Sequence, residues 1–340
     1  MVPAREGGAR PRAPARLIAR HRLLTTPGCP GAAADGHCGR SARHPAQRRR
    51  HRHRQIGDRE YPDPHESSGG FRDRRPGGSG DADFGVSAAD ATHVSSNGLR
   101  HYAEHPQENL RLVLPGPPFL LGFLVREGAR YQTVADLAGE PVGGEYPNTR
   151  PMFYDGRTIL HTVGLTWADL SVVPVASFRE GIQAFIEGRA VAAISSVGSG
   201  MTQQADAKVS GVRFLGLPNR PDISRMLWEH HPGYRAVPVE QGSALGIPHD
   251  MIVAGKDTYL IASAQTDADT VYAVASLLWR NMPALRAVHP FFASWTHQAM
   301  ANARVTIPFH VGSIRLLEEV GMWTAEHART HEARLAALSR

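Results

Sequence analysis

Residues 172–200 read VVPVASFREGIQAFIEGRAVAAISSVGSG and contain a strand, a helix and a second strand in order. The β-branched run Val172–Val175 predicts a buried strand. Ser177 and Glu180 have the S-x-x-E spacing of a capping box, in which each side chain satisfies a backbone N–H group at a helix start. The apolar residues that follow fall on one helical face, and Gly188 suits the end of that helix.

The second strand is expected at Ala190–Ile194, and it leads into a loop rich in hydroxyl groups and glycine. The loop contains Ser195, Ser196, Gly198 and Ser199. In open α/β sheets ligands bind at the carboxyl ends of strands, because backbone N–H groups and helix N-termini converge there. The pattern therefore predicts an α/β fold with a small-molecule site, for an anion. An ordinary strand-to-helix turn explains the same residues equally well.

Charge divides the 340-residue chain into two unlike parts. Residues 1–75 hold 17 of the 38 basic residues and 7 of the 32 acidic ones, a net charge of +10. The remainder holds 21 basic and 25 acidic residues, a net charge of −4. A folded domain that binds nucleic acid carries a basic face, so the acidic balance of the remainder argues against nucleic acid as a partner.

Residues 1–75 are rich in Arg, Gly, Pro, Ala and His and include the run RRRHRHR at 48–54. Such a composition buries too little apolar surface to offset the entropy of ordering. We therefore expect residues 1–76 to be a disordered basic segment. An interaction arm for acidic partners or metals is an alternative. The abrupt change to patterned sequence near residues 77–83 favours a third interpretation, in which a wrong start or a shifted reading frame produced the segment.

The sequence shows no sign of disulfides, membrane spans or a secretory signal. Cys29 and Cys38 are the only cysteines, so the remainder has neither disulfides nor thiolate metal sites, which agrees with an oxidising compartment. No stretch approaches the roughly 18 apolar residues of a membrane span. The N-terminus lacks the apolar core of about 7–15 residues that a signal peptide needs. His51 and His53 form only a weak metal motif.

Other elements are predicted on both sides of the opening stretch. The segments Leu110–Pro115 and Phe119–Arg126 are expected to be two strands around a Pro/Gly turn. His310 is interpreted as a hydrogen-bonded packing residue. The remaining predictions are a short helix from Val134, strands at Pro141–Gly144 and Val212–Leu217, helices at Pro151–Val163, Asp222–His230 and Thr270–Asn281, and an irregular, partly strand-like return at Gly246–Ile261.

The loop GGEYPNTRP, which ends at Pro151, is a second candidate site. Tyr146, Asn148, Thr149 and Arg150 offer hydrogen-bond donors, and proline suits a first helical turn. Arginine can hold a carboxylate with two parallel hydrogen bonds, so Arg150 is the expected anion-binding residue. An exposed arginine at a helix start is the more ordinary interpretation.

Six motifs between residues 79 and 323 carry a resemblance to a known family. They are DADFGVS, VADLAGEPVGG, ILHTVGLTWADL, FREGIQAFIEGRAVAAI, VYAVASLLWRN followed by AVHP, and IPFHVGSIRLLEEVG. In this order they resemble the solute-binding subunits of TRAP transporters of the TAXI type. No motif is diagnostic alone, and the specific signal is their common order.

The resemblance implies a two-lobed α/β fold of the type II periplasmic-binding-protein kind. Lobe 1 would comprise residues 77–139 plus 251–340 and lobe 2 residues 140–250, with crossovers near Phe119–Arg126 and Met251–Ile261. The implied function is non-catalytic capture of a small organic anion, either a carboxylate or an amino acid such as glutamate. Delivery to TRAP membrane permease subunits, a periplasmic or other extracytoplasmic location and the absence of cofactors and metals are implied as well.

The family's ligand-binding positions transfer to this chain in part. Ser195–Gly200 lies where the second-lobe ligand loop falls, and Ser87 lies in the matching loop of the first lobe. Of the family's Gly-Ser-Gly-Thr-like loop only Thr149 matches. The family's opening strand, its glycine- and tyrosine-rich loop and its signal peptide are not found in residues 1–75. An enzyme on the same scaffold remains an alternative, although no acid/base pair, metal cluster or nucleophile motif supports it. A further alternative is an interaction protein that uses the basic arm.

Overall fold

The computed structural model describes residues 83–338, so the expectations for residues 1–76 lie outside this range. The strands are β1 (Phe84–Ala88), β2 (Leu110–Arg126), β3 (Pro141–Glu145), β4 (Ser171–Val175), β5 (Ala192–Ser196), β6 (Val212–Leu215), β7 (Tyr234–Val239) and β8 (Met251–Ser263). The helices are α1 (Ala89–Ser96), α2 (Arg150–His161), α3 (Phe178–Ile186), α4 (Gly200–Val209), α5 (Ile223–His230), α6 (Ala268–Val288), α7 (His297–Met300), α8 (Val311–Glu319) and α9 (Ala325–Leu338). The short 3-10 turns are η1 (Arg100–Tyr102), η2 (Val134–Leu137), η3 (Trp167–Asp169) and η4 (Pro290–Phe292).

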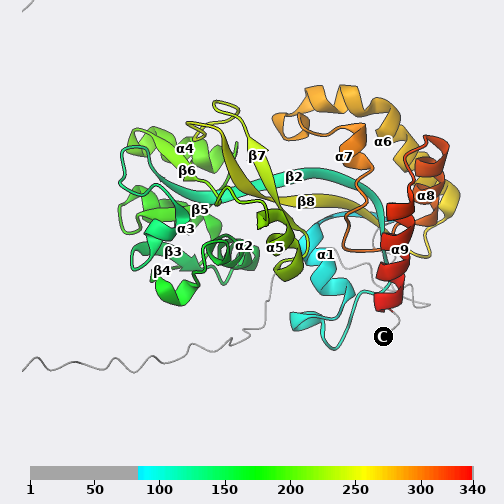
Figure 1. Cartoon of the computed structure of the whole chain (residues 1–340), viewed down its shortest axis with the longest axis horizontal. Helices are drawn as coiled ribbons and strands as arrows, with labels where there is room; N and C mark the ends of the chain where they lie inside the picture. The colour runs from blue at the N-terminus through cyan, green and yellow to red at the C-terminus, as the bar shows by residue number, and fades with distance from the viewer. Residues whose placement is uncertain (1–82, 339–340) are drawn as a thin grey trace, which may run out of the picture. The chain divides into compact units, whose positions relative to one another are not determined.

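Strands and helices are mixed throughout, which confirms the predicted α/β fold class (Figure 1). The sheet has the strand order β1-β8-β2-β5-β3-β4, with β6 beside β2 and β7 beside β8. Only the pairs of β3 with β4 and β5 are parallel. Among the described helices, none is long and apolar enough to cross a membrane.

The opening stretch folds as β4–α3–β5, in agreement with its sequence pattern. The side chain of Ser177 accepts a hydrogen bond from the Glu180 N–H at 3.3 Å. The Glu180 carboxylate reaches one residue further than a capping box requires and accepts from the Ala176 N–H at 2.9 Å. Gly188 has a φ of +76°, which a glycine adopts without strain at a helix end.

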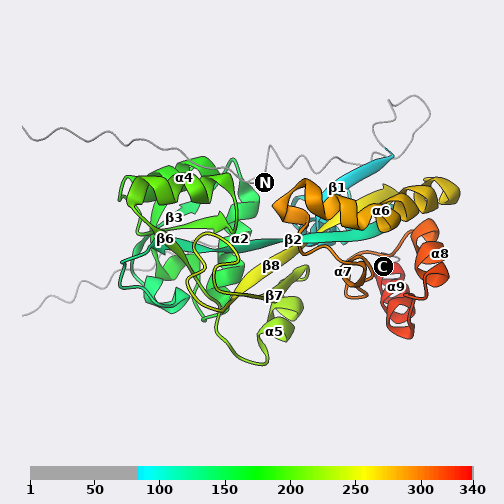
Figure 2. The same ribbon diagram turned by 90° about the horizontal axis from the view of Figure 1, so that it is seen from above.

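The strands β2 and β8 are the longest in the sheet and lie side by side in both views (Figures 1 and 2). They pair antiparallel from Leu110 opposite Ser263 to Leu121 opposite Ala254. Beyond this point β2 pairs with β5 and β6. These two strands therefore connect the elements β3–β6 to the elements β1 and α6–α8.

The prediction of two strands around a Pro/Gly turn is wrong, because Leu110–Arg126 is one continuous strand. Its register with β8 shifts between Pro115 and Pro118. Such an irregularity removes residues from the hydrogen-bond ladder, which is how a strand accommodates proline. Gly116 lies within it, where a Cβ atom would come to 2.3 Å from the hydroxyl of Thr258. The predicted return at Gly246–Ile261, partly strand-like, is irregular up to residue 250 and then forms the strand β8.

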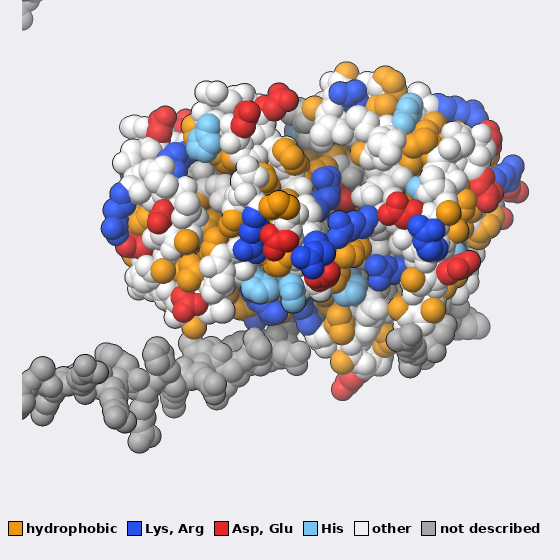
Figure 3. All heavy atoms as spheres, viewed as in Figure 1, with side chains coloured by type: hydrophobic (Ala, Val, Ile, Leu, Met, Phe, Trp, Pro, Cys, Tyr) orange, Lys and Arg blue, Asp and Glu red, His pale blue; other side chains and the backbone are white. Residues whose placement is uncertain are grey.

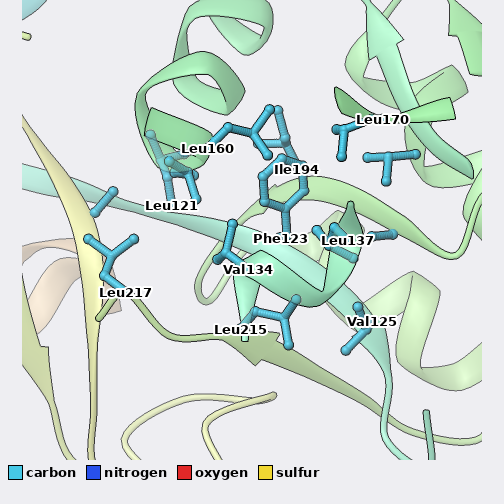
Figure 4. Close-up of a cluster of buried hydrophobic side chains, with 14 of the residues drawn as sticks. Leu121, Phe123, Val125, Val134, Leu137, Leu160, Leu170, Ile194, Leu215 and Leu217 are labelled. Atoms are coloured by element: carbon cyan, nitrogen blue, oxygen red, sulfur yellow. The ribbon is translucent and has the colours of Figure 1, made fainter. Parts of the chain in front are cut away.

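The buried apolar side chains form clusters that divide along β2 and β8. Two clusters contain Leu121 or Leu124 of β2 and extend through α2 to α5. In one of them the Phe123 ring meets the Trp167 ring edge-on at 6.3 Å, within the cluster that Figure 4 shows. The other two contain β2 residues up to Leu114 and extend through α6 to α8. The division falls at the irregular segment 115–118.

Candidate functional site

The two candidate loops follow neighbouring parallel strands. The loop after β3 leads into α2, and the loop after β5 leads into α4. Because Val142 of β3 pairs in parallel with Ala192 of β5, the carboxyl ends of both strands lie at the same edge of the sheet. The strand pairing therefore brings both candidate loops to one region of the molecule.

The β3–α2 loop is held against the start of α3. The Asn148 N–H donates to the Ala176 carbonyl oxygen at 2.8 Å. The Thr149 hydroxyl accepts from the Phe178 N–H at 2.9 Å. The Thr149 oxygen thus caps a neighbouring helix and positions the loop, while the Asn148 side chain is exposed.

Tyr146 does not present its side chain to a solute. Its ring is fully buried, and its hydroxyl donates to the Gly143 carbonyl oxygen at 3.1 Å. The ring packs against Gly181, where a Cβ atom would come to 2.9 Å from the phenol oxygen. Burial raises the Tyr146 pKa, so the hydroxyl stays protonated. Sequence reasoning counted this residue as a donor because a loop position does not reveal which way an aromatic side chain turns.

The hydroxyl groups of the β5–α4 loop mainly bond one another. Ser195 is fully buried, and its oxygen lies 2.8 Å from that of Thr202, so this serine too is turned inward. Ser199 caps α4 by accepting from the Thr202 N–H at 3.2 Å. Ser196 is half-buried and Gly198 is exposed, so the outer part of the loop is the part that a solute can reach.

Arg150 lies at the first position of α2 and is half-buried. Its guanidinium carbon lies 4.4 Å from the centre of the Phe153 ring. One of its nitrogens donates to the Glu145 carbonyl oxygen at 3.3 Å. The side chain is therefore oriented by an aromatic ring and one backbone acceptor, with no carboxylate of the described residues within 4.0 Å. Ser87, the predicted residue of the first lobe, lies half-buried in β1 opposite Tyr259.

A buried charged cluster that sequence reasoning missed lies on the other face of α2. The Lys256 ammonium of β8 lies 2.8 Å from Oδ1 of Asp155 and 3.7 Å from Oδ1 of Asp90. The Tyr234 hydroxyl donates to Asp155 and lies 3.2 Å from Oδ2 of Asp90. We refer to Asp90, Asp155, Tyr234 and Lys256 as the inner cluster. It joins α1, α2, β7 and β8.

The electrostatics of the inner cluster follow from its burial. Burial raises the pKa of the Asp155 carboxyl, and the Lys256 ammonium opposes this shift by attraction. Burial also raises the pKa of Tyr234, and the negative charge of Asp155 adds to the effect. Two carboxylates share one ammonium, so a raised Asp155 pKa brings the cluster closer to neutrality. One sequence signal could have indicated it, because the charged pair Lys256–Asp257 stands in the middle of the mainly apolar strand MIVAGKDTYLIAS.

The described part of the chain contains no group of three or more His, Cys, Asp or Glu residues arranged to hold a metal ion. The chemistry of the region is that of hydrogen bonding and charge: an arginine, hydroxyl groups and the starts of two helices at one sheet edge. Arginine side chains and helix N-termini are groups that anion-binding sites of proteins commonly use.

A family model matches most of the part of the chain that the structure describes. Residues 74–321 match the model of the NMT1-like family. The chain belongs to the NMT1-like family. Members are periplasmic solute-binding proteins of the transporter type, which bind small ligands and work with membrane components.

Three solved structures are similar to this chain. The periplasmic aliphatic sulphonate binding protein SsuA from Escherichia coli is 17% identical, with 75% of this chain and 67% of that chain covered and a TM-score of 0.35. A structure described as a periplasmic transporter is 12% identical, with 74% and 76% covered and a TM-score of 0.39. A mutant of ArgBP from T. maritima is 13% identical, with 56% and 64% covered and a TM-score of 0.31. TM-scores this low carry no argument about the fold or the solute.

Proposed function

We propose that this protein is the solute-binding subunit of a TRAP-type transporter of the TAXI kind. It captures a small organic anion, a carboxylate or an amino acid such as glutamate, and delivers it to membrane permease subunits. Membership of the NMT1-like family and the order of the six motifs support the proposal. The division into two lobes is part of it. The separation of the hydrophobic clusters supports a boundary at residues 115–118 of β2, because Leu121, Val134 and Leu137 pack with residues of proposed lobe 2.

The anion proposal rests on the location of Arg150 and on its lack of a carboxylate partner. The arginine stands where two loops with hydroxyl groups end at one sheet edge, and it lacks a carboxylate partner among the described residues. A solute carboxylate that leaves water needs charge-assisted hydrogen bonds, and an arginine supplies two in parallel. A helix N-terminus alone contributes only about 0.3–1 kcal/mol.

The other members of the proposed site have different roles. Asn148, Ser196 and Gly198 are accessible and can donate to the solute directly. Thr149 and Ser199 cap helices and hold the loops in place. Ser87 is the proposed contact from lobe 1.

Replacing Arg150 with alanine tests the proposal. We expect Arg150→Ala to weaken binding of L-glutamate or succinate by about 1.5–3 kcal/mol, the range for hydrogen bonds to a charged group. Calorimetric titration of both proteins measures the difference. Arg189→Ala is the matched control, because Arg189 is exposed and already paired with Glu187 at 2.8 Å. Equal affinities of wild type and Arg150→Ala would move the anion site to the serine loops.

A further inference from the structure

Arg100 belongs to η1, between α1 and β2, and was not among the predicted site residues. Its guanidinium carbon lies 3.5 Å from the centre of the Tyr154 ring of α2. The backbone of Arg100 has a φ of +57°, a left-handed conformation that is uncommon for a residue other than glycine. The structure thus holds this side chain against a helix that lies 50 residues away in the sequence.

Tyr154 lies between two arginines of its own helix. Arg150, Tyr154 and Arg157 are spaced four and three residues apart, so they lie along one face of α2. The guanidinium carbon of Arg150 is 5.7 Å from the centre of the Tyr154 ring. Since Arg100 approaches the same centre to 3.5 Å, the two guanidinium carbons are separated by no more than the sum of these distances.

Arg100, Arg150 and Arg157 are among the arginines of the described residues that form no ion pair. Between residues 83 and 338, no carboxylate oxygen lies within 4.0 Å of the side-chain nitrogens of Arg100, Arg150 or Arg157. By contrast, ion pairs occupy Arg130 with Glu140, Arg189 with Glu187, Arg220 with Asp222, Arg225 with Glu229, Arg235 with Asp257 and Arg315 with Asp269.

Residues 76–340 carry a net charge of −4, so acidic side chains are in excess, yet none of the described ones forms an ion pair with these three arginines. Figure 3 shows Lys, Arg and His side chains at the middle of one face, with Asp and Glu side chains among them, where Figure 1 shows α5 between α2 and α1. Arginines without an acidic partner repel one another when they are close together, and an anion that binds between them reduces this repulsion.

Stacking on an aromatic ring leaves an arginine able to bind an anion. The ring occupies the flat face of the guanidinium, whereas the N–H donors point outward in its plane. The guanidinium group of Arg100 makes no hydrogen bond to any described residue, and that of Arg150 makes one, to the Glu145 carbonyl oxygen. Both side chains are therefore oriented in advance while most of their donors stay available.

We propose that Arg100 and Arg150 form a clamp for one oxyanion group of the solute, a carboxylate, sulfonate or phosphate, with Tyr154 as the platform that orients both guanidinium groups. This inference rests on the proposed function and adds a second arginine to its site. Arg100 belongs to proposed lobe 1 and Arg150 to proposed lobe 2, so the bound group holds the two lobes together. An anion that contacts both arginines is then retained more strongly than one that contacts Arg150 alone.

The experiment uses the full chain and proceeds in two steps. Thermal unfolding of the wild type is first followed with L-glutamate, succinate, methanesulfonate and inorganic phosphate. The panel anion that raises the melting temperature most is then titrated calorimetrically into wild type, Arg100→Gln, Arg150→Gln and the double variant. Arg225→Gln is the matched control, because Arg225 is an exposed arginine of α5 that faces Glu229 at 3.8 Å.

We expect Arg100→Gln to lower the affinity at least about tenfold, as the loss of a charge-assisted hydrogen bond implies, and the control to change it less than about twofold. The double variant should lose less than the product of the single losses, because both arginines hold the same group. Arg100→Lys, which keeps the charge but not the paired donors, should fall between wild type and Arg100→Gln.

The possible outcomes test the arginine clamp and the proposed anion-binding function separately. Unchanged affinity in Arg100→Gln, with loss in Arg150→Gln, overturns the clamp and leaves the anion-binding function standing. If no anion of the panel binds to the wild type, both proposals fail. Should Arg100→Gln not fold, as circular dichroism would show, Arg100→Lys and Tyr154→Leu decide the question, and wild-type affinity in both overturns the clamp.

Discussion

The two faces of α2 differ in whether their charged side chains have partners within the protein. On the inner face, Asp155 is completely buried and is paired with Lys256 at 2.8 Å. On the outer face, Arg150 and Arg157 reach solvent and lack acidic partners within the described residues. A buried charge without a partner costs several kcal/mol, whereas an exposed charge keeps its hydration. Burial therefore decides which charges the chain must neutralise itself and which it can leave for a ligand.

The largest effect is expected from breaking the inner cluster. Lys256→Met should lower the free energy of unfolding by about 3–5 kcal/mol, because it leaves Asp90 and Asp155 without their common cation. Urea denaturation measures this change. The control Lys208→Met, at an exposed position near the end of α4, should stay within about 0.5 kcal/mol of wild type. A loss below about 1 kcal/mol for Lys256→Met would break the comparison between the two faces.

A smaller effect is expected at the C-terminal end of α2, where His231 Nε2 lies 2.8 Å from His161 Nδ1. Burial, followed by the positive charge of His161 and Arg157, lowers the His231 pKa from 6.5 to about 3. The unfolded chain therefore binds a proton at His231 more readily than the folded chain. The free energy of unfolding therefore decreases progressively as the pH falls from 6.5 towards about 3, because the unfolded chain takes up a proton at His231 and the folded chain does not.

Thermal unfolding at pH 7 and pH 5 tests this histidine. His231→Gln should lose less stability between these pH values than wild type, by at most about 1.4 kcal/mol per pH unit for one proton. His249→Gln, at an exposed position, is the control. An identical pH dependence in His231→Gln and wild type would show that folding does not lower the pKa of His231.

The smallest effect is expected on the outer face. Arg157→Gln should change the free energy of unfolding by less than about 0.5 kcal/mol, because the side chain is exposed and has no acidic partner among the described residues. The same urea titrations measure it. A destabilisation above about 1 kcal/mol would reveal a structural role for the outer arginines and remove the contrast with Lys256.

Several features of the site could be predicted from neighbouring residues alone. The S-x-x-E spacing located the start of α3, and Gly188 located its end. The interpretation of His310 as a packing residue is confirmed, since it is buried and its ring nitrogen accepts from the Gly312 N–H at 3.1 Å. Capping and periodicity act over a few residues, so the local sequence is sufficient to reveal them.

Other features depended on contacts between distant segments. The prolines of β2 indicated a turn, yet pairing with β8 keeps them within one irregular strand. The side chain of Tyr146, in the β3–α2 loop, turns inward because Gly181 of α3 leaves room for its ring.

The sequence by itself determined the order strand–helix–strand of β4, α3 and β5, both ends of α3 and the two loops at the ends of β3 and β5. Only the tertiary structure decided which charges meet. Asp155 and Lys256 are 101 residues apart in the chain, and Asp90 and Tyr234 are 144 apart. In the same way, the side chain of Arg100 in η1 contacts the ring of Tyr154 in α2, although β2 and β3 lie between them in the sequence. Side-chain pairing between such segments depends on the packing of the whole sheet, which no local pattern encodes.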